Sequence, residues 1–459
     1  MGFREFITNR LYRKKLQAEF DDIQNIQPPA NLGRPYINKL VERLLSEKHT
    51  KAAQVELKLI GRDAAPSLLA ALRDPKYQEE AMIYLLLELL VPHSPDHVAA
   101  AAMPLIRSSS SSIRKTAALH LASLGRDDSV PLLAELLNDV NGYVRAYVMI
   151  GAQRALAEGR CGEGFRRSMY ELLLAQCDKK WEVALNDAAS AVVELDRARA
   201  TVDFASERWL SPSNPNVHQI LEACNQTGIL LPEKLVRRLL DHSLPLAIGE
   251  RCYPHQYVVG GALEALARRL GEQIKPLLEE LLASDQEKIR ESAAKGLAKI
   301  AGLEDPVNYV IQRAQKVGFE GLTAPERVVY CGFLFDAEVC NGGIMQFFGN
   351  TSGDRAVETL EALRVLNLPE AFNGLDTAMN LVGPLSREPD RDMRLTAFEG
   401  RYDELQAGFE PLEHAYYATK GLLRQRILLY AVANADHFQS PSPIETDKSL
   451  GDATSTPMD

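Results

Sequence analysis

One short pattern recurs along the first two thirds of the chain, and it constrains the fold more than any other feature of the sequence. Each copy begins with a glycine, reaches a proline five or six residues later and continues through a leucine-rich run to an aspartate. Copies begin at Gly61, Gly125 and Gly271. Glycine often ends a helix, and proline suits the first turn of the next one. Each copy therefore predicts a junction between two helices.

Further helices are expected to begin at the Ile-Arg or Val-Arg pairs that contain Arg114, Arg145 and Arg290, the first two of which are 31 residues apart. These repeats resemble the HEAT family, in which helical hairpins stack on one another. A single hairpin cannot bury its own apolar stripe, so its neighbours must cover it. We assign the recurring arginines and aspartates a structural role, as ion pairs that tie adjacent hairpins together.

The pattern predicts an all-α fold in which residues 51–303 form a HEAT-like α-solenoid. Residues 1–50 are expected to form an N-terminal helical cap, and residues 304–438 a separate all-helical domain. Helices are expected in that domain at 307–317, 324–340, 354–366, 369–382, 391–406 and 412–436. Residues 439–459 are mostly Pro, Ser, Thr and Asp with few apolar residues, which predicts a disordered tail.

The segment 341–353 differs in composition from both the repeats and the linkers. The helix before it opens with Thr323 and Glu326, a capping-box pattern, and ends in an Asn-Gly-Gly sequence. Beyond the glycines, Gln346 and Asn350 are four residues apart and would share one helical face. The candidate residues of the segment are Asn341, Gly342, Gly343, Gln346, Phe347, Phe348, Asn350, Ser352 and Gly353.

The residue types in this segment each suggest a structural role. Two glycines allow positive φ, so Gly342 and Gly343 are expected to shape a turn. Gln346 and Asn350 are expected to hydrogen-bond across that turn, while one of the two phenylalanines packs in the core. Two interpretations remain open: the segment binds a partner, or it serves folding alone.

The pattern Asn-Gly-Gly-x-x-Gln-Phe-Phe-x-Asn-[Ser/Thr]-Ser-Gly resembles the central motif of the DUF4375 family, whose relatives include the DMP19-type DNA-mimic proteins. The resemblance covers about residues 304–438. It implies an all-helical domain that binds protein partners and carries no catalytic activity. Ile344 stands where an aromatic residue is usual, so we expect the packing around it to differ.

Acidic residues concentrate in the C-terminal third. The whole chain has a net charge of −10, and residues 304–459 alone carry 24 acidic and 13 basic residues, a net of −11. Asp354, Glu358 and Glu361 are spaced to form one acidic row on a helix that Thr351 or Ser352 would cap. Because arginines interrupt the row and the charge is far sparser than that of duplex DNA, we expect a solvated face rather than a copy of the phosphate backbone.

The sequence lacks the motifs of common catalytic and phosphate-binding sites. His93 and His97 have helical ligand spacing, but prolines flank them and no third ligand follows. We therefore predict no metal, no cofactor and no catalytic residue. An enzyme or a nucleic-acid-processing protein stays the alternative. It would use the concave face of the repeats, or the 341–353 segment with Cys340 as nucleophile and His414 as base.

Cysteine usage and hydropathy suggest a location. The six cysteines are far apart and include no C-x-x-C pair, so they indicate buried free thiols in a reducing compartment. No apolar run reaches the roughly 20 residues of a membrane helix, and no secretory signal begins the chain. We expect a cytoplasmic protein without a membrane span.

Together these features predict a non-catalytic protein that binds or regulates another protein. The resemblance suggests a bacterial protein that sequesters or neutralises a partner such as a toxin or a DNA-binding protein. The nearly neutral repeats argue against nucleic acid as the partner. The sequence leaves the oligomeric state open.

Overall fold

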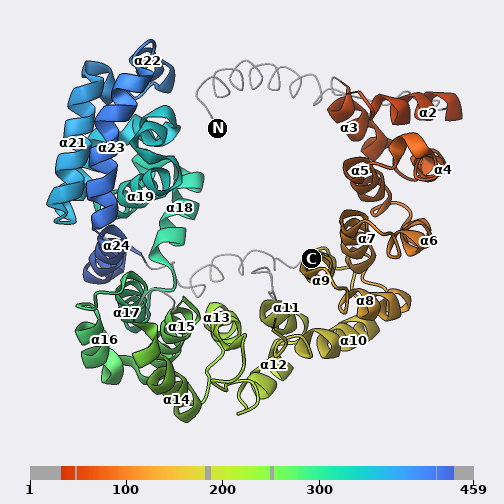
Figure 1. The fold of residues 1–459 in the computed structure, drawn as a ribbon, viewed down its shortest axis with the longest axis horizontal. Helices are drawn as coiled ribbons and strands as arrows, with labels where there is room; N and C mark the ends of the chain where they lie inside the picture. Colours follow the sequence, from red (N-terminus) through yellow and green to blue (C-terminus); the bar gives the residue numbers. More distant parts are fainter. Residues whose placement is uncertain (1–32, 47–48, 181–187, 249–252, 420, 439–459) are drawn as a thin grey trace, which may run out of the picture. The chain divides into compact units, whose positions relative to one another are not determined.

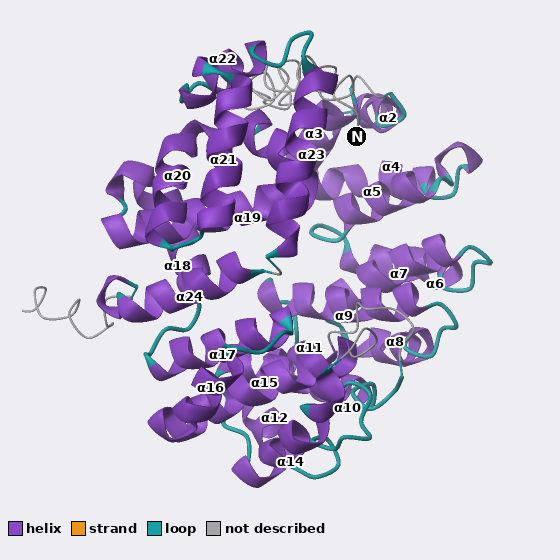
Figure 2. Ribbon diagram, turned by 60° about the vertical axis from the view of Figure 1, so that its left-hand side comes forward, coloured by secondary structure: helices purple, strands orange, loops and turns teal. Residues whose placement is uncertain are grey.

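The computed structural model describes residues 33–46, 49–180, 188–248, 253–419 and 421–438. Within these ranges every regular element is a helix, which confirms the predicted all-α class (Figure 2). Most of the predicted N-terminal cap and the whole predicted tail lie outside the described residues. The chain divides into two compact units, residues 1–227 and 228–459.

The first unit is built from short helices. They are α2 (Arg34–Arg43), α3 (Thr50–Ile60), α4 (Ala65–Ala71), α5 (Glu80–Leu90), α6 (Pro95–Leu105), α7 (Ser111–Ser123), α8 (Val130–Leu136), α9 (Gly142–Ala157), α10 (Glu163–Leu174), α11 (Ala188–Leu195), α12 (Arg197–Phe204) and α13 (Val217–Thr227). Single 3₁₀ turns lie at η1 (Gly61–Ala64), η2 (Pro75–Tyr77) and η3 (Asp127–Ser129).

The second unit contains the longest described helices, α15, α19 and α23, together with shorter ones. They are α14 (Glu233–Ser243), α15 (Tyr253–Leu270), α16 (Lys275–Leu281), α17 (Glu287–Ile300), α18 (Pro306–Val317), α19 (Ala324–Gly349), α20 (Ala356–Val365), α21 (Pro369–Val382), α22 (Arg391–Thr396), α23 (Tyr402–Ala418) and α24 (Leu422–Ala433). Its 3₁₀ turns are η4 (Pro245–Ala247), η5 (Gly271–Ile274), η6 (Phe319–Gly321), η7 (Thr351–Arg355), η8 (Pro384–Arg387) and η9 (Ala435–His437).

Helices of the first unit pack in sequence order. α5, α7, α9, α11 and α13 each contact the next member of this series, and α6, α8, α10 and α12 pack against the same series from outside (Figure 1). Alternate helices therefore form neighbouring rows, as stacked hairpins do. The HEAT-like solenoid itself stays a prediction.

The predicted junctions are confirmed at the backbone level. Gly61, Gly125 and Gly271 have φ of 66°, 66° and 56°, a region that glycine reaches without a steric penalty. The proline of each copy lies in the first turn of α4, α8 or α16. There its missing N–H costs no helical hydrogen bond.

The recurring arginines hold loops in place, and Arg114 forms an ion pair of the kind expected. The guanidinium of Arg114 donates to both carboxylate oxygens of Asp139, over 2.7 and 3.0 Å, and so joins α7 to the loop before α9. Burial alone would raise the pKa of Asp139, but hydrogen bonds from Arg114 and from the Asn141 N–H lower it below its usual value. Arg114, Arg145 and Arg290 each also donate to the carbonyl six residues earlier.

The second unit joins a repeat-like part to the C-terminal helices. α24 packs on α17, and the Gln425 amide donates to the Leu282 carbonyl over 3.2 Å. Residues on both sides of the predicted boundary near 303 thus belong to one compact unit, and the division at 227/228 falls inside the predicted solenoid. The predicted domain limits remain untested.

Two of the predicted C-terminal helices are wrong. Residues 391–406 contain all of α22 and the start of α23, separated by Gly400 with φ of 73°. Residues 412–436 likewise contain the end of α23 and all of α24, with a break at Gly421, whose φ is 70°. The helical spacing of apolar residues continues across both glycines. A prediction from this periodicity therefore merged helices that are separate in the structure.

One helix in the described ranges, α19, is long and apolar enough to cross a membrane by length and composition alone. A core helix of a water-soluble domain has the same properties. α19 is bent in its interior, and its buried Asp336 accepts hydrogen bonds from Tyr416 and Arg424. These features are those of a core helix.

Candidate functional site

The predicted motif lies at a break inside α19. The helix begins with the expected capping box, in which Thr323 and Glu326 bond each other's backbone N–H groups. Helical geometry is interrupted at Gly342 (φ −158°, ψ 22°) and Gly343 (φ 77°, ψ −176°), and it resumes until Gly349. The positive φ of Gly343 confirms that a glycine shapes this turn.

A distant carboxylate holds the restarted helix. The Ile344 N–H donates to Glu413 Oε1 of α23 over 2.7 Å. This N–H is one of the donors that a helix start leaves without an intrahelical partner, and a negative charge there is favoured by the helix dipole. A Cβ on Gly343 would overlap the same carboxylate, so the close approach needs glycine.

A second carboxylate accepts hydrogen bonds from three polar side chains of the motif. Glu338 accepts hydrogen bonds from the Gln346 amide (2.6 Å), the Asn350 amide (2.8 Å) and the Ser352 hydroxyl (2.5 Å). The prediction that Gln346 and Asn350 bond across the turn is confirmed, but their common acceptor was missed. The position of Glu338, about one helical turn before the glycines, was the sequence feature that could have identified it as the acceptor.

A buried arginine closes the end of α19. Arg394 is fully buried and donates to the carbonyls of Phe348 (3.2 Å), Asn350 (2.8 Å) and Glu388 (2.6 Å). It also pairs with the Asp354 carboxylate at 2.5 Å. The guanidinium thereby satisfies carbonyls that a helix end leaves unpaired.

The remaining motif residues lie on two sides of the break. Phe347 and Phe348 are both fully buried, and Ile344 is almost so. Ser352 and Gly353 are also buried, whereas Asn341 and Gly342 are exposed. The motif therefore exposes its first two residues to solvent, keeps Gln346 and Asn350 half-buried and buries both phenylalanines.

The acidic row differs from the prediction. Asp354 lies in η7, before α20, and neither Thr351 nor Ser352 caps α20, because a 3₁₀ turn intervenes. Glu358 pairs with Arg355 at 3.2 Å, and Glu361 pairs with Arg364 at 2.5 Å. With Asp354 paired to Arg394, every carboxylate of the row has an arginine partner. Such a row is a poor imitation of unpaired phosphates.

The cysteine prediction is wrong at Cys340, which is exposed, and Cys161 is only half-buried. Partial burial and the neighbouring Asp336 carboxylate raise the pKa of Cys340, so its thiol stays protonated. Its Sγ lies 3.7 Å from Asp336 Oδ1, and no hydrogen bond joins it to His414 among the described residues. This arrangement does not activate a nucleophile.

The first unit carries a second candidate surface, here named the tyrosine face. It consists of Tyr84 of α5, Lys115 of α7, and Tyr143, Tyr147 and Ile150 of α9. The α9 members recur at helical spacing and so lie on one side of that helix. Lys115 lies over the Tyr147 ring at 5.2 Å and pairs with Glu80 of α5 at 2.9 Å. The face therefore spans three helices.

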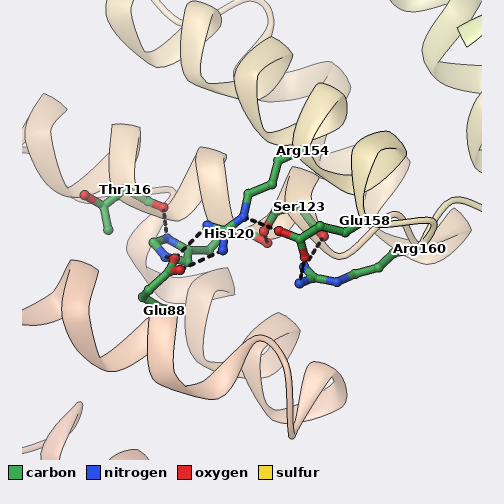
Figure 3. A network of polar contacts seen from close by, with 7 residues as sticks. All are labelled: Glu88, Thr116, His120, Ser123, Arg154, Glu158 and Arg160. Carbon is green, nitrogen blue, oxygen red and sulfur yellow. Dashed lines mark hydrogen bonds and ion pairs between the residues drawn. The ribbon is translucent and has the colours of Figure 1, made fainter. Parts of the chain in front are cut away.

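A polar network joins the same three helices (Figure 3), and its His120 ring lies 5.1 Å from the Tyr84 ring of the tyrosine face. Arg154 of α9 forms a two-pronged ion pair with Glu88 of α5, over 2.6 and 2.7 Å. His120 of α7 is fully buried between them, with Nδ1 2.8 Å from the Thr116 carbonyl. Its Nε2 lies 3.4 Å from Glu88 Oε2 without hydrogen-bond geometry.

The network continues towards the end of α9. Arg154 also pairs with Glu158 at 2.9 Å, and Arg160 pairs with Glu158 and donates to the Ser123 carbonyl over 2.9 Å. Hydrogen bonds from Arg154 lower the pKa of Glu88 far below its usual value. α5, α7 and α9 are thus tied together by charge as well as by packing.

The candidate metal ligands His93 and His97 do not share one helix, because α6 begins between them at Pro95. In the part of the chain that the structure describes, no group of three or more His, Cys, Asp or Glu side chains is placed to hold a metal ion.

Replacing Gly343 with alanine should destabilise the second unit by about 2–4 kcal/mol, since left-handed φ costs about 1–2 kcal/mol and Glu413 must also move. Gly374 of α21 is the matched control, because a Cβ there meets nothing within 4 Å. Gly374→Ala should be neutral or stabilise by up to about 1 kcal/mol. Urea unfolding measures the stability of both variants. Equal unfolding midpoints would contradict a requirement for glycine at position 343.

The double variant Gln346→Ala/Asn350→Ala should lower the melting temperature. It removes two of the three donors to Glu338 and leaves a half-buried carboxylate short of partners, at a cost of about 1–3 kcal/mol. Asn380→Ala is the control, since that amide reaches Asp376 at 3.4 Å on an exposed surface. Calorimetry that finds the double variant as stable as the parent would refute the structural role.

Glu88→Gln should reduce stability at neutral pH by about 1–3 kcal/mol, because it removes one partner of a largely buried ion pair. The folded-state pKa of Glu88 is depressed, so its contribution is complete above the unfolded value of about 4.3 and fades as the pH falls below it. The difference from the parent should therefore shrink on acidification.

Urea unfolding as a function of pH measures this difference. The control is Glu163→Gln, whose side chain is 90% exposed in its ion pair with Arg167 and should show no such trend. A Glu88→Gln effect that is independent of pH would contradict the assigned ion pair.

The comparison with known families concerns the second unit. Residues 320–434 match the family model described as DMP19-like protein. The match covers about a quarter of the chain and includes the break in α19, Glu338, Arg394 and Glu413. No curated protein matches the chain. The resemblance expected from the motif is thus confirmed, and the C-terminal part of this chain contains a DMP19-like domain.

Proposed function

We propose that this chain is a non-catalytic, protein-binding regulator whose principal docking surface is the tyrosine face. In this proposal the helix rows of the first unit form a HEAT-like solenoid, and the DMP19-like domain contributes a second contact. The observation that carries the proposal is the composition and exposure of the tyrosine face.

Large apolar side chains are exposed together on this face. Tyr84, Tyr143 and Ile150 are 40%, 50% and 42% exposed. Tyrosine is among the residue types most often found as energetic anchors of protein interfaces, and clustered apolar exposure marks such interfaces. The tyrosine rings sit on helices held by cross-helix ion pairs, so little order is lost when a partner docks.

The charges around the face favour a protein over a nucleic acid. Lys115 and Arg154 are matched by Glu80 and Glu88, so these four groups have no net charge. Nucleic-acid binding relies on unpaired cations that replace the counterions of phosphates. A partner with an apolar stripe suits a neutral aromatic surface better.

The DMP19-like domain supports a binding role without chemistry at the motif. Gln346 and Asn350 use their amides on Glu338, and the Cys340 thiol is not activated. Through the family resemblance, we propose that the bound protein is sequestered or neutralised, as a toxin or a DNA-binding protein would be. The free cysteines suit the cytoplasm as the place of action.

The proposal is tested with a variant in which Tyr84, Tyr143 and Ile150 are all replaced by serine. Partners captured by the parent from native cells are identified by quantitative mass spectrometry and titrated by calorimetry. We expect the variant to bind at least about 30-fold more weakly, since hot-spot residues contribute about 2 kcal/mol or more.

The matched control replaces Met103 of α6 and Val202 of α12 with serine, because both side chains are at least half exposed in the same unit away from the face. That control should bind as the parent does. Equal binding by the tyrosine-face variant would reject this surface, and a parent that enriches no protein would reject the binding function.

A further inference from the structure

The chain contains three Asn-Gly pairs, at Asn141, Asn341 and Asn373. An asparagine followed by glycine can cyclise, because glycine has no side chain to hinder the approach of its backbone nitrogen to the asparagine side chain. The reaction also requires the backbone after asparagine to leave helical geometry. The three pairs share one local sequence, so their structures decide which of them reacts.

Two of the pairs are held in unreactive conformations. Asn141 caps α9, and its Oδ1 accepts the Tyr143 N–H over 2.9 Å, while Gly142 is buried. Asn373 and Gly374 lie inside α21, with helix on both sides. Rotation at either site would break a cap or several helical hydrogen bonds, which is costly because helices form cooperatively.

Asn341 is placed differently. It is exposed, Gly342 is exposed, and both residues after Asn341 have already left helical geometry. Rotation at Asn341 therefore breaks fewer regular helical hydrogen bonds than rotation at Asn373 inside α21. Residues at the end of a helical segment open at a smaller free-energy cost than residues in a helix interior.

From this geometry we propose that Asn341 is a site of spontaneous deamidation through a succinimide. The Gly342 nitrogen attacks Asn341 Cγ, a new C–N bond forms, and the Cγ–Nδ2 bond breaks. The departing nitrogen takes up protons and leaves as ammonia. Water then opens the ring. Cleavage at Cγ gives aspartate, and cleavage at the main-chain carbonyl gives isoaspartate; no oxidant, reductant or enzyme is needed.

The product changes the motif. A carboxylate replaces a neutral amide three residues from Glu338, on the same side of the helix. The isoaspartate form also adds one carbon to the backbone directly before the turn that Glu413 holds. Like charges and a longer backbone both weaken the contacts of Gln346 and Asn350 with Glu338. Because deamidation is slow and spontaneous, the fraction of molecules with an altered motif should increase with the time since synthesis.

The experiment incubates the full-length protein under mildly alkaline conditions, which promote attack by the deprotonated backbone amide. Peptide mapping by mass spectrometry, together with enzymatic methylation of isoaspartate, follows all three pairs in one sample. We expect Asn341 to convert at least about tenfold faster than Asn373, because opening α21 costs more than the about 1.4 kcal/mol that corresponds to this factor.

The urea-unfolded chain is the internal control, and there the three sites should convert at similar rates. Asn341→Gln should abolish the fast phase in the native protein and leave the other two sites unchanged. Native conversion of Asn341 no faster than that of Asn373, or a fast phase that persists in Asn341→Gln, would overturn the proposal.

Discussion

The hydrogen bond from the Ile344 N–H to the Glu413 carboxylate is the contact on which the DMP19-like domain depends. Without it, the second half of α19 would begin with an unpaired donor, and α23 would no longer hold the turn that the glycines allow. This bend in α19 places Gln346, Asn350 and Ser352 within hydrogen-bonding distance of Glu338. It also directs the last carbonyls of α19 towards Arg394. Most of the polar side chains in the motif are therefore occupied in holding its shape.

The first unit uses charge in a comparable way. Arg114 and Asp139 join a helix to the loop of the next hairpin, while Glu88 and Arg154 join α5 to α9 across α7. These pairs are matched in sign, so they stiffen the rows without building a charged surface. What remains exposed on the tyrosine face is aromatic and aliphatic. This separation of stiff, paired charges from exposed apolar groups is the physical basis of the proposed docking role.

Local features were readable from the sequence because they depend on neighbouring residues. The glycine and proline junctions, the capping box at Thr323 and the turn at Gly343 all follow from preferences within a few positions. The carboxylates that accept hydrogen bonds from the motif could not be predicted in this way. Glu413 lies 69 residues from Ile344, and no periodicity links the two. Apolar spacing likewise ran across Gly400 and joined helices that are separate.

The site predictions illustrate the same limit. Asp354, Glu358 and Glu361 have the spacing of one row, yet a 3₁₀ turn and the buried Arg394 take Asp354 out of it. Cys340 was expected to be buried at a helix end, but the break in α19 exposes it. Exposure and ion pairing depend on which helices meet. The tyrosine face went unnoticed because its members come from three helices.

Hydrogen–deuterium exchange with and without a captured partner tests most directly where this protein binds. The account predicts that α5, α7 and α9 gain protection when the partner is added, while the amides around Gly343 and Ile344 exchange as before. Protection that appears at the break in α19 and is absent from α5, α7 and α9 would contradict it.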